Sequence, residues 1–420
     1  MTTTQPVTSP GTEFDLFLPL RSKGGLENPF AIYALLRTVR PVMKMPTEGY
    51  EGPGIWFLTR YQDVHDALRD PRFSVDRRRA HLFKAFSDRF PRQLLEGPNG
   101  FRTMLMMDPP DHTRIRHLVN RAFTPRRVEE RLRPRIEALV DELLAPLRVC
   151  AELELMRDFA EPLPAIVIAE LLGVPARDHR QFKQWSSELL AGGPVRAFEP
   201  GAQERTAALF GRLREYVGGI VAERRKAPGE DMISGLIDAQ EEHDALSEGE
   251  LISTSLLLLI AGHETTTNLI GNGLLALLRH PDQLERLRRE PDLLENAIEE
   301  LLRYDSPVQA TVRIATEDVA IAGSVIPKDA IALALLGAAN RDPAEFPEPD
   351  RLDLARENVR HLSFGLGTHF CLGAGLARLE ARLAFRGLLA LPGLHLATDT
   401  PEYRPNPFLR GLRTLPLRLG

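Results

Sequence analysis

Residues 364–373 read Phe-Gly-Leu-Gly-Thr-His-Phe-Cys-Leu-Gly and place Cys371, one of only two cysteines in the chain, in a glycine-rich loop. A stretch typical of a helix follows at once. Gly365, Gly367 and Gly373 leave room for backbone N–H groups to approach the sulfur, and the start of the following helix favours negative charge. The pattern is typical of a loop that holds a thiolate, and thiolates bind metals.

Spacing alone leaves a second interpretation open, in which Cys371 is a buried structural thiol and the glycines are turn residues. Five positions nevertheless match the cysteine-ligand loop of the cytochrome P450 family, which this segment resembles: Phe364, Gly367, His369, Cys371 and Gly373. The resemblance implies that Cys371 is the axial ligand of the iron of haem b and that the other four positions contact the haem. Thiolate ligation of haem iron favours O–O cleavage.

The composition is that of an ordinary globular protein, with 420 residues, 43% of them hydrophobic and 26% charged. A formal net charge of −5 gives no basic footprint for nucleic acid. The most apolar run, Leu256–Ala261, is far shorter than the roughly 20 residues that span a bilayer, and the N-terminus lacks the pattern of a signal peptide. Two cysteines give no disulfide framework. We expect a cytoplasmic protein with no membrane anchor and no nucleic-acid partner.

Helical periodicity, interrupted by Pro and Gly, covers most of the chain, and no internal repeat is present. Strand-like runs are few: Gly54–Thr59, Val319–Ile326 and Ala330–Leu336. These patterns predict a mainly α protein with small β-sheets (α+β), formed by a helical lobe and a smaller β-rich lobe. No linker interrupts the chain, so residues 1–420 are expected to form a single domain and a monomer, with residues 1–14 as a flexible arm.

Two helices stand out. The first begins at Ser247, with Glu250 three residues on as a capping box, and ends at His280. Its roughly 33 residues at about 1.5 Å each give roughly 50 Å, enough to cross the molecule. The second runs from Pro291 to Tyr304. The resemblance implies that the haem lies between the long helix and the helix that follows Cys371.

Residues 261–266 of the long helix read Ala-Gly-His-Glu-Thr-Thr. Gly and Thr can open a helix locally, but they also occur in buried helices for packing reasons. The segment matches the oxygen-binding stretch of the family. The resemblance implies that Ala261 contacts the haem, Thr265 hydrogen-bonds the bound oxygen or its water, and Glu264 relays protons from outside. An acid followed by an alcohol favours a reaction driven by O2 over one driven by peroxide.

Glu300 and Arg303 are neighbours on the second helix because they are three residues apart. The apolar stripe of that helix runs through four other positions: Leu294, Ala297, Ile298 and Leu301. Periodicity therefore predicts an exposed salt bridge worth a few tenths of a kcal/mol. The resemblance implies instead a buried pair that supports the cysteine loop, joined by Arg351 from Phe-Pro-Glu-Pro-Asp-Arg.

His112 and Arg116 are four residues apart and share one helix face. Spacing alone favours an exposed basic patch at the start of a helix. The segment matches a family helix that holds a haem propionate, and Arg313 and His369 match further propionate contacts. Other branches of the family carry tryptophan where His112 stands, so the resemblance is to the soluble bacterial type.

Arg378, Arg382 and Arg386 recur every four residues after the cysteine and form one basic helix face. Such runs are mostly solvated. Since this helix would lie on the cysteine side of the haem, the face is also a candidate docking surface for an acidic electron donor, together with Arg116 and Arg126.

The substrate pocket is predicted from position and apolar character. Five residues could line it, although each would equally suit a core: Leu257, Ile260, Val308, Phe408 and Leu409. Their character indicates a hydrophobic small molecule. The segment Arg77–Gly100 is rich in Arg and Phe, and we expect a loop that covers the substrate.

The resemblance implies a haem-thiolate monooxygenase that inserts one oxygen atom from O2 into a hydrophobic substrate by hydroxylation or epoxidation. Electrons would come from NAD(P)H through a separate ferredoxin and ferredoxin reductase, and the expected setting is secondary metabolism. Oxidative coupling, desaturation, peroxygenation and a non-catalytic haem-binding protein remain alternatives. Glu264 and Thr265 weigh against the last two.

Overall fold

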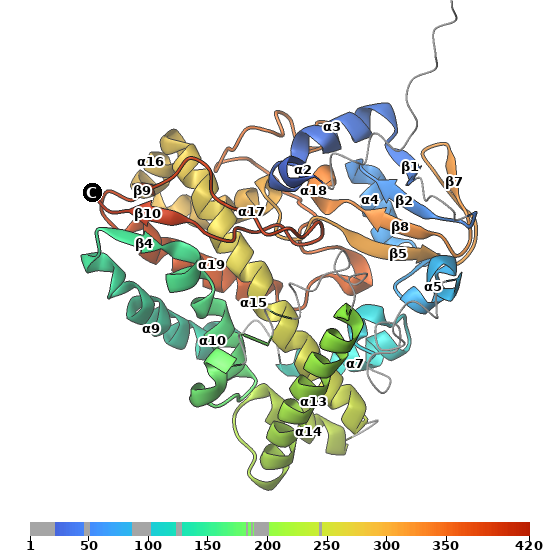
Figure 1. Cartoon of the computed structure of the whole chain (residues 1–420), viewed down its shortest axis with the longest axis horizontal. Helices are drawn as coiled ribbons and strands as arrows, with labels where there is room; N and C mark the ends of the chain where they lie inside the picture. The colour runs from blue at the N-terminus through green and yellow to red at the C-terminus, as the bar shows by residue number, and fades with distance from the viewer. Residues whose placement is uncertain are drawn as a thin grey trace, which may run out of the picture.

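The computed structural model describes residues 22–45, 51–85, 102–122, 128–181, 184–185, 188, 201–242 and 246–420. The predicted flexible arm, residues 1–14, lies outside these ranges. Helices form most of the molecule, and a β-rich part lies at the upper right of Figure 1. The predicted mainly α fold with small sheets is confirmed.

The long helix α15 (Glu248–Arg279, 32 residues) runs diagonally through the molecule (Figure 1). Ser247 caps its N-terminus, and the side chains and backbones of Ser247 and Glu250 satisfy one another as a capping box. His280 is the C-cap and Pro281 begins the next helix. The predicted boundaries are therefore confirmed, and they follow from local capping chemistry.

Seven helices surround α15 or continue its lobe, and Figure 1 shows α13 and α14 at the lower end and α9 and α10 beside it. They are α7 (Asp111–Ala122), α9 (Arg133–Leu144), α10 (Pro162–Leu171), α13 (Ala202–Lys226), α14 (Met232–Glu242), α17 (Leu294–Tyr304) and α19 (Ala374–Leu389). The largest hydrophobic core lies among α9, α15, α17 and α19. Each helix therefore contributes its apolar face to a common interior.

The main sheet has five strands in the order β1-β2-β8-β5-β3. Its strands are β1 (Val42–Met45), β2 (Ile55–Leu58), β3 (Phe73–Ser74), β5 (Thr311–Ala315) and β8 (Ile331–Ala334). Only β2 and β8 pair in parallel. The predicted strands near residues 54–59 and 330–336 are thus confirmed, and the sheet fixes β5 at the wall of the cavity described below.

Two smaller sheets complete the β structure. The predicted strand region Val319–Ile326 forms a hairpin of β6 (Val319–Ile321) and β7 (Ser324–Ile326), in which Ala322 and Gly323 have φ of 47° and 80°. A turn with two positive φ angles matches the twist of paired strands. The third sheet has the order β4-β10-β9, formed by β4 (Glu152–Glu154), β9 (His395–Leu396) and β10 (Pro416–Arg418).

Short helices connect these elements. The α-helical ones are α2 (Lys23–Glu27), α3 (Phe30–Val39), α4 (Tyr61–Arg69), α5 (His81–Ala85), α16 (Pro281–Arg289) and α18 (Leu336–Ala339). The 3₁₀ helices are η2 (Arg77–Arg79), η3 (Met104–Met106), η5 (Leu147–Val149), η7 (Ala176–Asp178), η8 (Pro291–Leu293) and η9 (Gly367–His369), and π-helical turns are η4 (Val128–Leu132) and η6 (Met156–Ala160). Within the described parts of the chain, no helix combines the length and apolar character needed to cross a membrane.

We expect Gly273→Ala to destabilise the protein where α15 crosses α19. A Cβ at Gly273 would lie 2.6 Å from Cζ of Phe385, whose side chain is fully buried. Overpacking of a core typically costs about 1–3 kcal/mol. The urea concentration at the unfolding midpoint should fall accordingly.

Gly219→Ala in α13 is the matched control, because a Cβ there would meet no atom within 4 Å. Removing a glycine from the interior of a helix should stabilise the protein by up to about 1 kcal/mol. Midpoints that shift in the same direction for both variants would contradict the assignment of Gly273 to a close helix crossing.

Candidate functional site

A cavity of about 310 Å³ lies where α15, α19, α7 and β5 approach one another. Cys371, Thr265, His112 and Arg313 all line it, although they come from segments far apart in the sequence. Most of the other lining side chains are apolar. A concave apolar site with a few convergent polar groups is the usual form of a small-molecule site.

One face of α15 forms a wall of this cavity. Its lining residues follow a helical spacing: Leu257, Leu258, Ala261, Gly262, Thr265, Thr266 and Leu269. The hydroxyl of Thr265 donates a hydrogen bond to the carbonyl of Ala261 at 3.2 Å, so its oxygen keeps acceptor capacity toward the cavity. The helix is continuous here. A Cβ at Gly262 would lie 2.9 Å from Ile168, so this glycine allows α10 to approach closely.

The loop before α19 presents Cys371 to the cavity. Its backbone N–H donates to the carbonyl of Phe364 at 2.8 Å, and Gly373 is the N-cap of α19. Gly365 and Gly367 have φ of 69° and 72°, in the left-handed region that glycine adopts without strain. Gly367 does not line the cavity; a Cβ there would lie 3.0 Å from the carbonyl oxygen of Leu68. Gly367 therefore serves the turn in this structure, and its contact with a haem stays a prediction.

The thiol of Cys371 is accessible through the cavity. Burial raises its pKa, whereas the N–H of Gly373 and the charges of Arg116 and Arg378 lower it. The N–H of Gly373 acts on the sulfur in the direction that the sequence predicted, although burial has the larger effect. A bound metal ion would supply the missing stabilisation, because a coordinating thiol is deprotonated by the metal.

Four basic side chains form what we call the cationic cluster: His112, Arg116, Arg313 and His369, all of which line the cavity. The rings of His112 and His369 have centroids 4.1 Å apart. Burial lowers the pKa of His112, lowers that of His369 to about 3 and lowers that of Arg313 to about 10. The pKa shift of His369 also reflects repulsion by His112 and Arg313, so these groups are close neighbours.

The cationic cluster has no carboxylate partner among the residues that the structure describes. Arg116 donates to the carbonyl of Phe370 at 2.7 Å, and Arg313 donates to the carbonyl of Val312 at 2.9 Å. Asp108 acts on the pKa of His112, Arg313 and His369, but its carboxylate accepts hydrogen bonds from Ser74 and from the N–H of Val75. Uncompensated cations at a cavity wall fit an anionic group, such as the two propionates of a haem.

The residues present therefore fit a haem. Cys371 offers one soft ligand, and within the described ranges no group of three or more His, Cys, Asp and Glu side chains could hold a separate metal ion. Ala261, Phe364 and Gly373 also line the cavity, as predicted for haem contacts. The guanidinium of Arg378 lies 4.6 Å from the ring centroid of Phe364, which fixes that ring beside the cysteine loop.

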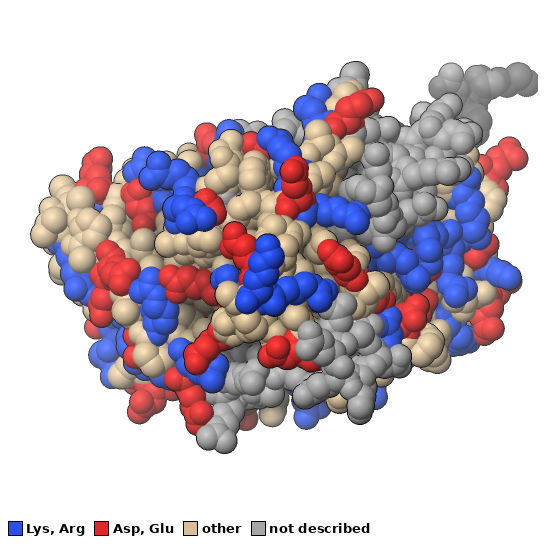
Figure 2. Space-filling view, turned by 90° about the horizontal axis from the view of Figure 1, so that it is seen from below, with Lys and Arg blue, Asp and Glu red and all other residues tan. Residues whose placement is uncertain are grey.

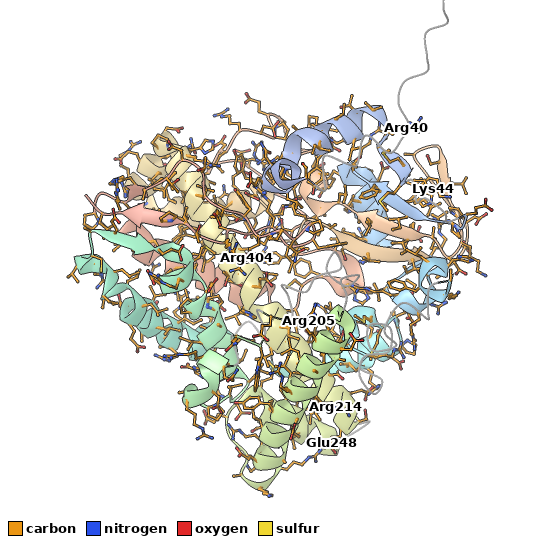
Figure 3. All side chains as sticks on the ribbon, in the orientation of Figure 1. Arg40, Lys44, Arg205, Arg214, Glu248 and Arg404 are labelled. Carbon is orange, nitrogen blue, oxygen red and sulfur yellow. The ribbon has the colours of Figure 1, made fainter. Side chains whose placement is uncertain are left out.

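Glu264 lies outside the cavity lining, on the flank of α15 next to it. It is 7% exposed and Oε2 has no hydrogen-bond partner. Arg404 lies 3.6 Å from Glu264 and 2.5 Å from Glu161, and Figure 3 shows it against the middle of α15. Burial raises the pKa of Glu264, and Arg404 lowers it. Arg404 was missed in the sequence because it belongs to no motif.

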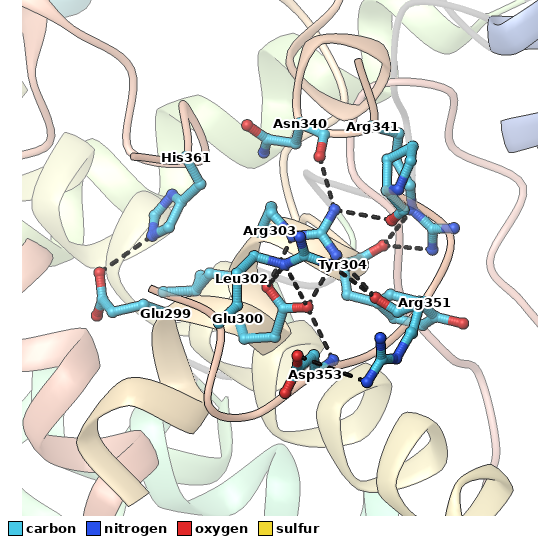
Figure 4. Close-up of polar contacts among 12 residues, drawn as sticks. Glu299, Glu300, Leu302, Arg303, Tyr304, Asn340, Arg341, Arg351, Asp353 and His361 are labelled. Carbon is cyan, nitrogen blue, oxygen red and sulfur yellow. Dashed lines mark hydrogen bonds and ion pairs between the residues drawn. The ribbon is translucent and has the colours of Figure 1, made fainter. Parts of the chain in front are cut away.

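Glu300 and Arg303 form a fully buried ion pair, with Nε to Oε2 at 2.7 Å and Nη2 to Oε1 at 2.8 Å (Figure 4). The exposed pair that periodicity predicted is wrong. Arg303 also donates to the carbonyls of Asn340 and Pro349, so a loop covers the helix face opposite the apolar stripe. Burial, as the resemblance implied, is confirmed.

The third member of this network is Arg356 and not Arg351. Arg356 donates from Nε to both oxygens of Glu300 at 3.2 Å. The Arg351 side chain is 59% exposed and pairs with Glu348 at 2.9 Å, while only its carbonyl accepts from Arg303. The prediction of Arg351 is wrong because the chain turns outward there and returns to α17 five residues later.

The predicted substrate residues are only partly brought together. Leu257 and Val308 line the cavity, whereas Ile260, Phe408 and Leu409 do not. Ile260 lies on the same flank of α15 as Glu264, one turn before it. Phe408 packs against a cluster that includes Tyr33 and Met43, and Leu409 forms a β-bridge with Val308. These three assignments are wrong because adjacent residues face different sides.

The described part of the predicted covering loop is helical and not loop-like. Residues 77–85 form η2 and α5, and residues 86–100 lie outside the described ranges. Arg77 lines the cavity, as do Met104 and Leu105 of the following segment. That this segment covers the substrate stays a prediction, and the sequence did not single out Met104 and Leu105.

The basic face of α19 is largely neutralised. Arg378 donates to both oxygens of Glu299 at 2.7 Å, and Arg382 lies 2.5 Å from Glu295. Arg386 is exposed, and Arg126 lies outside the described residues. Acidic and basic side chains are interspersed over much of the face in Figure 2. The predicted docking surface of unpaired arginines on α19 is therefore not present, because two of its three arginines are paired with glutamates.

Comparisons with known proteins identify the family. The profile described as Cytochrome P450 matches residues 55–409. The chain is 45% identical to the vitamin D(3) 25-hydroxylase of Pseudonocardia autotrophica, covering 99% of this chain and 98% of the relative. It is 42% identical to the 6-deoxyerythronolide B hydroxylase of Saccharopolyspora erythraea, covering 93% and 96%. The structure of myxobacterial cytochrome P450 CYP267B1 with myristic acid aligns with a TM-score of 0.86 at 40% identity, covering 96% and 99%.

We expect Arg356→Gln to destabilise the protein strongly, because it removes one of two cations from a buried carboxylate. Breaking a buried ion pair costs about 3–5 kcal/mol, and the remaining Arg303 should keep the loss near the lower value. The urea midpoint and the amount of haem retained after purification should both fall. Arg351→Gln should change stability by less than about 0.5 kcal/mol, as an exposed substitution does. Equal effects of the two variants would contradict the assignment of Arg356.

Proposed function

The chain belongs to the cytochrome P450 family and is an oxidoreductase of the monooxygenase type, and on that premise we propose how its own residues serve the reaction. The observation that carries the proposal is a cavity at which Cys371, Thr265 and the cationic cluster converge. Cys371 would ligate the iron of haem b, and His112, Arg116, Arg313 and His369 would bind its propionates. The haem, when bound, supplies the activation of O2 and the transfer of one oxygen atom to the substrate.

The chain itself supplies binding and proton transfer. Thr265 holds a hydroxyl at the cavity wall, fixed by the carbonyl of Ala261. On the other flank of α15, Glu264 lies near Arg404, which in turn pairs with Glu161. The side chains of Arg404 and Glu161 are partly exposed, so this row of charges leads from Glu264 toward solvent. Because burial raises the pKa of Glu264, its carboxyl can exchange protons nearer to neutral pH than an exposed one. We propose that Glu264 takes up protons from the Arg404 side of α15. Thr265 then positions the proton at the cavity wall.

The substrate is proposed to be a hydrophobic small molecule that is hydroxylated or epoxidised. Leu257, Leu258, Ile168 and Val308 give the cavity an apolar wall, and apolar surface favours an apolar ligand. Relatives named above act on vitamin D3 and 6-deoxyerythronolide B, and one binds myristic acid. We also propose a role in secondary metabolism, and the similarity to the 6-deoxyerythronolide B hydroxylase supports it.

The electron supply and the setting are further parts of the proposal. We assign the electrons to NAD(P)H through a separate ferredoxin and ferredoxin reductase, and the protein to the cytoplasm as a monomer. Residues 55–409 match one family profile, which supports a single domain. Because Arg378 and Arg382 of α19 are paired with Glu299 and Glu295, this face is not assigned as the ferredoxin contact.

The reduced, CO-bound protein should show the strongly red-shifted haem band that thiolate ligation produces. Cys371→Ala should abolish this band, because no other described thiol lines the cavity. Cys150→Ala is the matched control and should leave the band unchanged, since Cys150 is an exposed thiol outside the cavity. A band typical of histidine ligation in the well-folded wild type would refute the proposal and favour a non-catalytic haem protein.

We expect Arg404→Gln to move the alkaline fall of coupled turnover to higher pH. Burial raises the pKa of Glu264 and Arg404 lowers it, so loss of Arg404 leaves this carboxyl protonated to a higher pH. The measurement is product formed per O2 consumed as a function of pH, with a substrate found by spectral screening. Arg413→Gln, an exposed change in the same C-terminal segment, should keep the wild-type profile. An unshifted profile in Arg404→Gln would exclude Glu264 as the titrating group.

A further inference from the structure

We propose that the substrate carries a carboxylate and that Arg77 binds it at the wall of the cavity. This inference rests on the proposed monooxygenase function and deepens it by naming the anionic end of the substrate. Arg77 belongs to η2, whose N-cap Asp76 accepts from the N–H of Arg78 and so fixes the start of the turn. Val75, Met104 and Leu105 line the cavity together with it.

Arg77 differs from the arginines around it in having no acidic partner. Arg78 pairs with Asp76 at 2.5 Å, Arg79 lies 3.9 Å from Asp108, and Arg102 lies 3.7 Å from Asp111. No hydrogen bond or ion pair joins the guanidinium of Arg77 to any residue that the structure describes, and no charged neighbour contributes to its pKa. An arginine that lines a cavity without a partner is suited to an anionic ligand.

Arg77 is also separate from the cationic cluster that fits the haem. Arg77 belongs to η2, whereas His112 and Arg116 belong to α7, Arg313 to β5 and His369 to η9. Arg77 therefore adds a cation to the cavity wall from an element that carries no member of the cluster.

Charge balance supports a separate ligand for Arg77. The two arginines of the cationic cluster, Arg116 and Arg313, stay charged near neutral pH. Arg116 and Arg313 then supply two positive charges for two propionates. The charge of Arg77 remains unmatched by the haem.

The chemistry of this position favours a carboxylate over a larger anion. Arg78, Arg79 and Arg102 are each paired with an acidic side chain, so Arg77 offers a single unpaired guanidinium. One guanidinium matches a monoanion, and it can bind the two carboxylate oxygens in a fork. The remaining wall is mostly apolar, with Leu257, Leu258 and Val308 among its residues. The ligand that matches both features is a hydrocarbon acid whose apolar part lies along α15 and whose oxidised carbon is remote from the carboxylate.

The test is binding of straight-chain fatty acids, from octanoic to hexadecanoic acid, and of the 1-alkanols of the same lengths to the ferric holoprotein. The spin-state shift of the haem band and the heat of binding give the dissociation constants. We expect the best acid to bind the wild type at least about tenfold more tightly than the alcohol of its length, since hydrogen bonds to charged groups contribute that much. Arg77→Gln should remove this preference while leaving binding of the alcohol within about twofold, because the apolar contacts are retained.

Arg79→Gln is the matched control: it makes the same change two residues away, at an arginine that does not line the cavity. It should keep the preference for acids, and Arg77→Lys should keep part of it. Three results would overturn the proposal: no acid binds better than its alcohol, Arg77→Gln retains the preference, or Arg77→Gln loses haem while Arg79→Gln does not. The last result would assign Arg77 to the cofactor. Failure of the proposed function would appear separately, in the CO spectrum.

Discussion

The buried carboxylate of Glu300, shared between Arg303 and Arg356, is the interaction on which the cysteine side of the site depends. Isolated, this charge would be costly to bury, so both guanidinium groups are needed. The network continues beyond the ion pair. Arg303 donates to the carbonyl of Asn340, whose side chain donates to Ser306 and Ser363 at 2.7 and 2.8 Å. Ser363 directly precedes the loop of Cys371, so the position of the thiol is coupled to the ion pair through a continuous series of hydrogen bonds.

Helix α15 imposes the second constraint, because one of its faces lines the cavity while the adjacent face lies outside it. Leu257, Ala261 and Thr265 face the cavity. Ile260 and Glu264 are each one position away and lie on the other flank. A residue rotates by about 100° from its neighbour in an α-helix, so an acid next to an alcohol in sequence need not share its environment. This arrangement lets Glu264 meet Arg404 while the Thr265 hydroxyl stays at the cavity wall.

Much of the fold could be predicted because its signals are local. The capping box of Ser247 and Glu250 and the strand-like run of residues 319–326 depend only on nearby residues, and the sequence predicts both. The environment of Glu300 and the identity of its second arginine could not be predicted in this way. They depend on the loop after Asn340, which packs over α17 from far along the chain. The contact of Arg404 with Glu264 could not be predicted for the same reason, because a distant C-terminal segment brings Arg404 to α15.

The same distinction applies to charge. The chain as a whole has a formal net charge of −5, yet the cavity wall is cationic. Composition reports an average over the surface, whereas ligand binding depends on the few charges that lack a partner. Arg378 and Arg382 have suitable helical spacing but are matched by Glu299 and Glu295. Arg116 and Arg313 donate only to carbonyl and hydroxyl oxygens among the described residues. A buried arginine that pairs with no carboxylate is therefore more informative about function than the number of arginines, and only the folded chain reveals it.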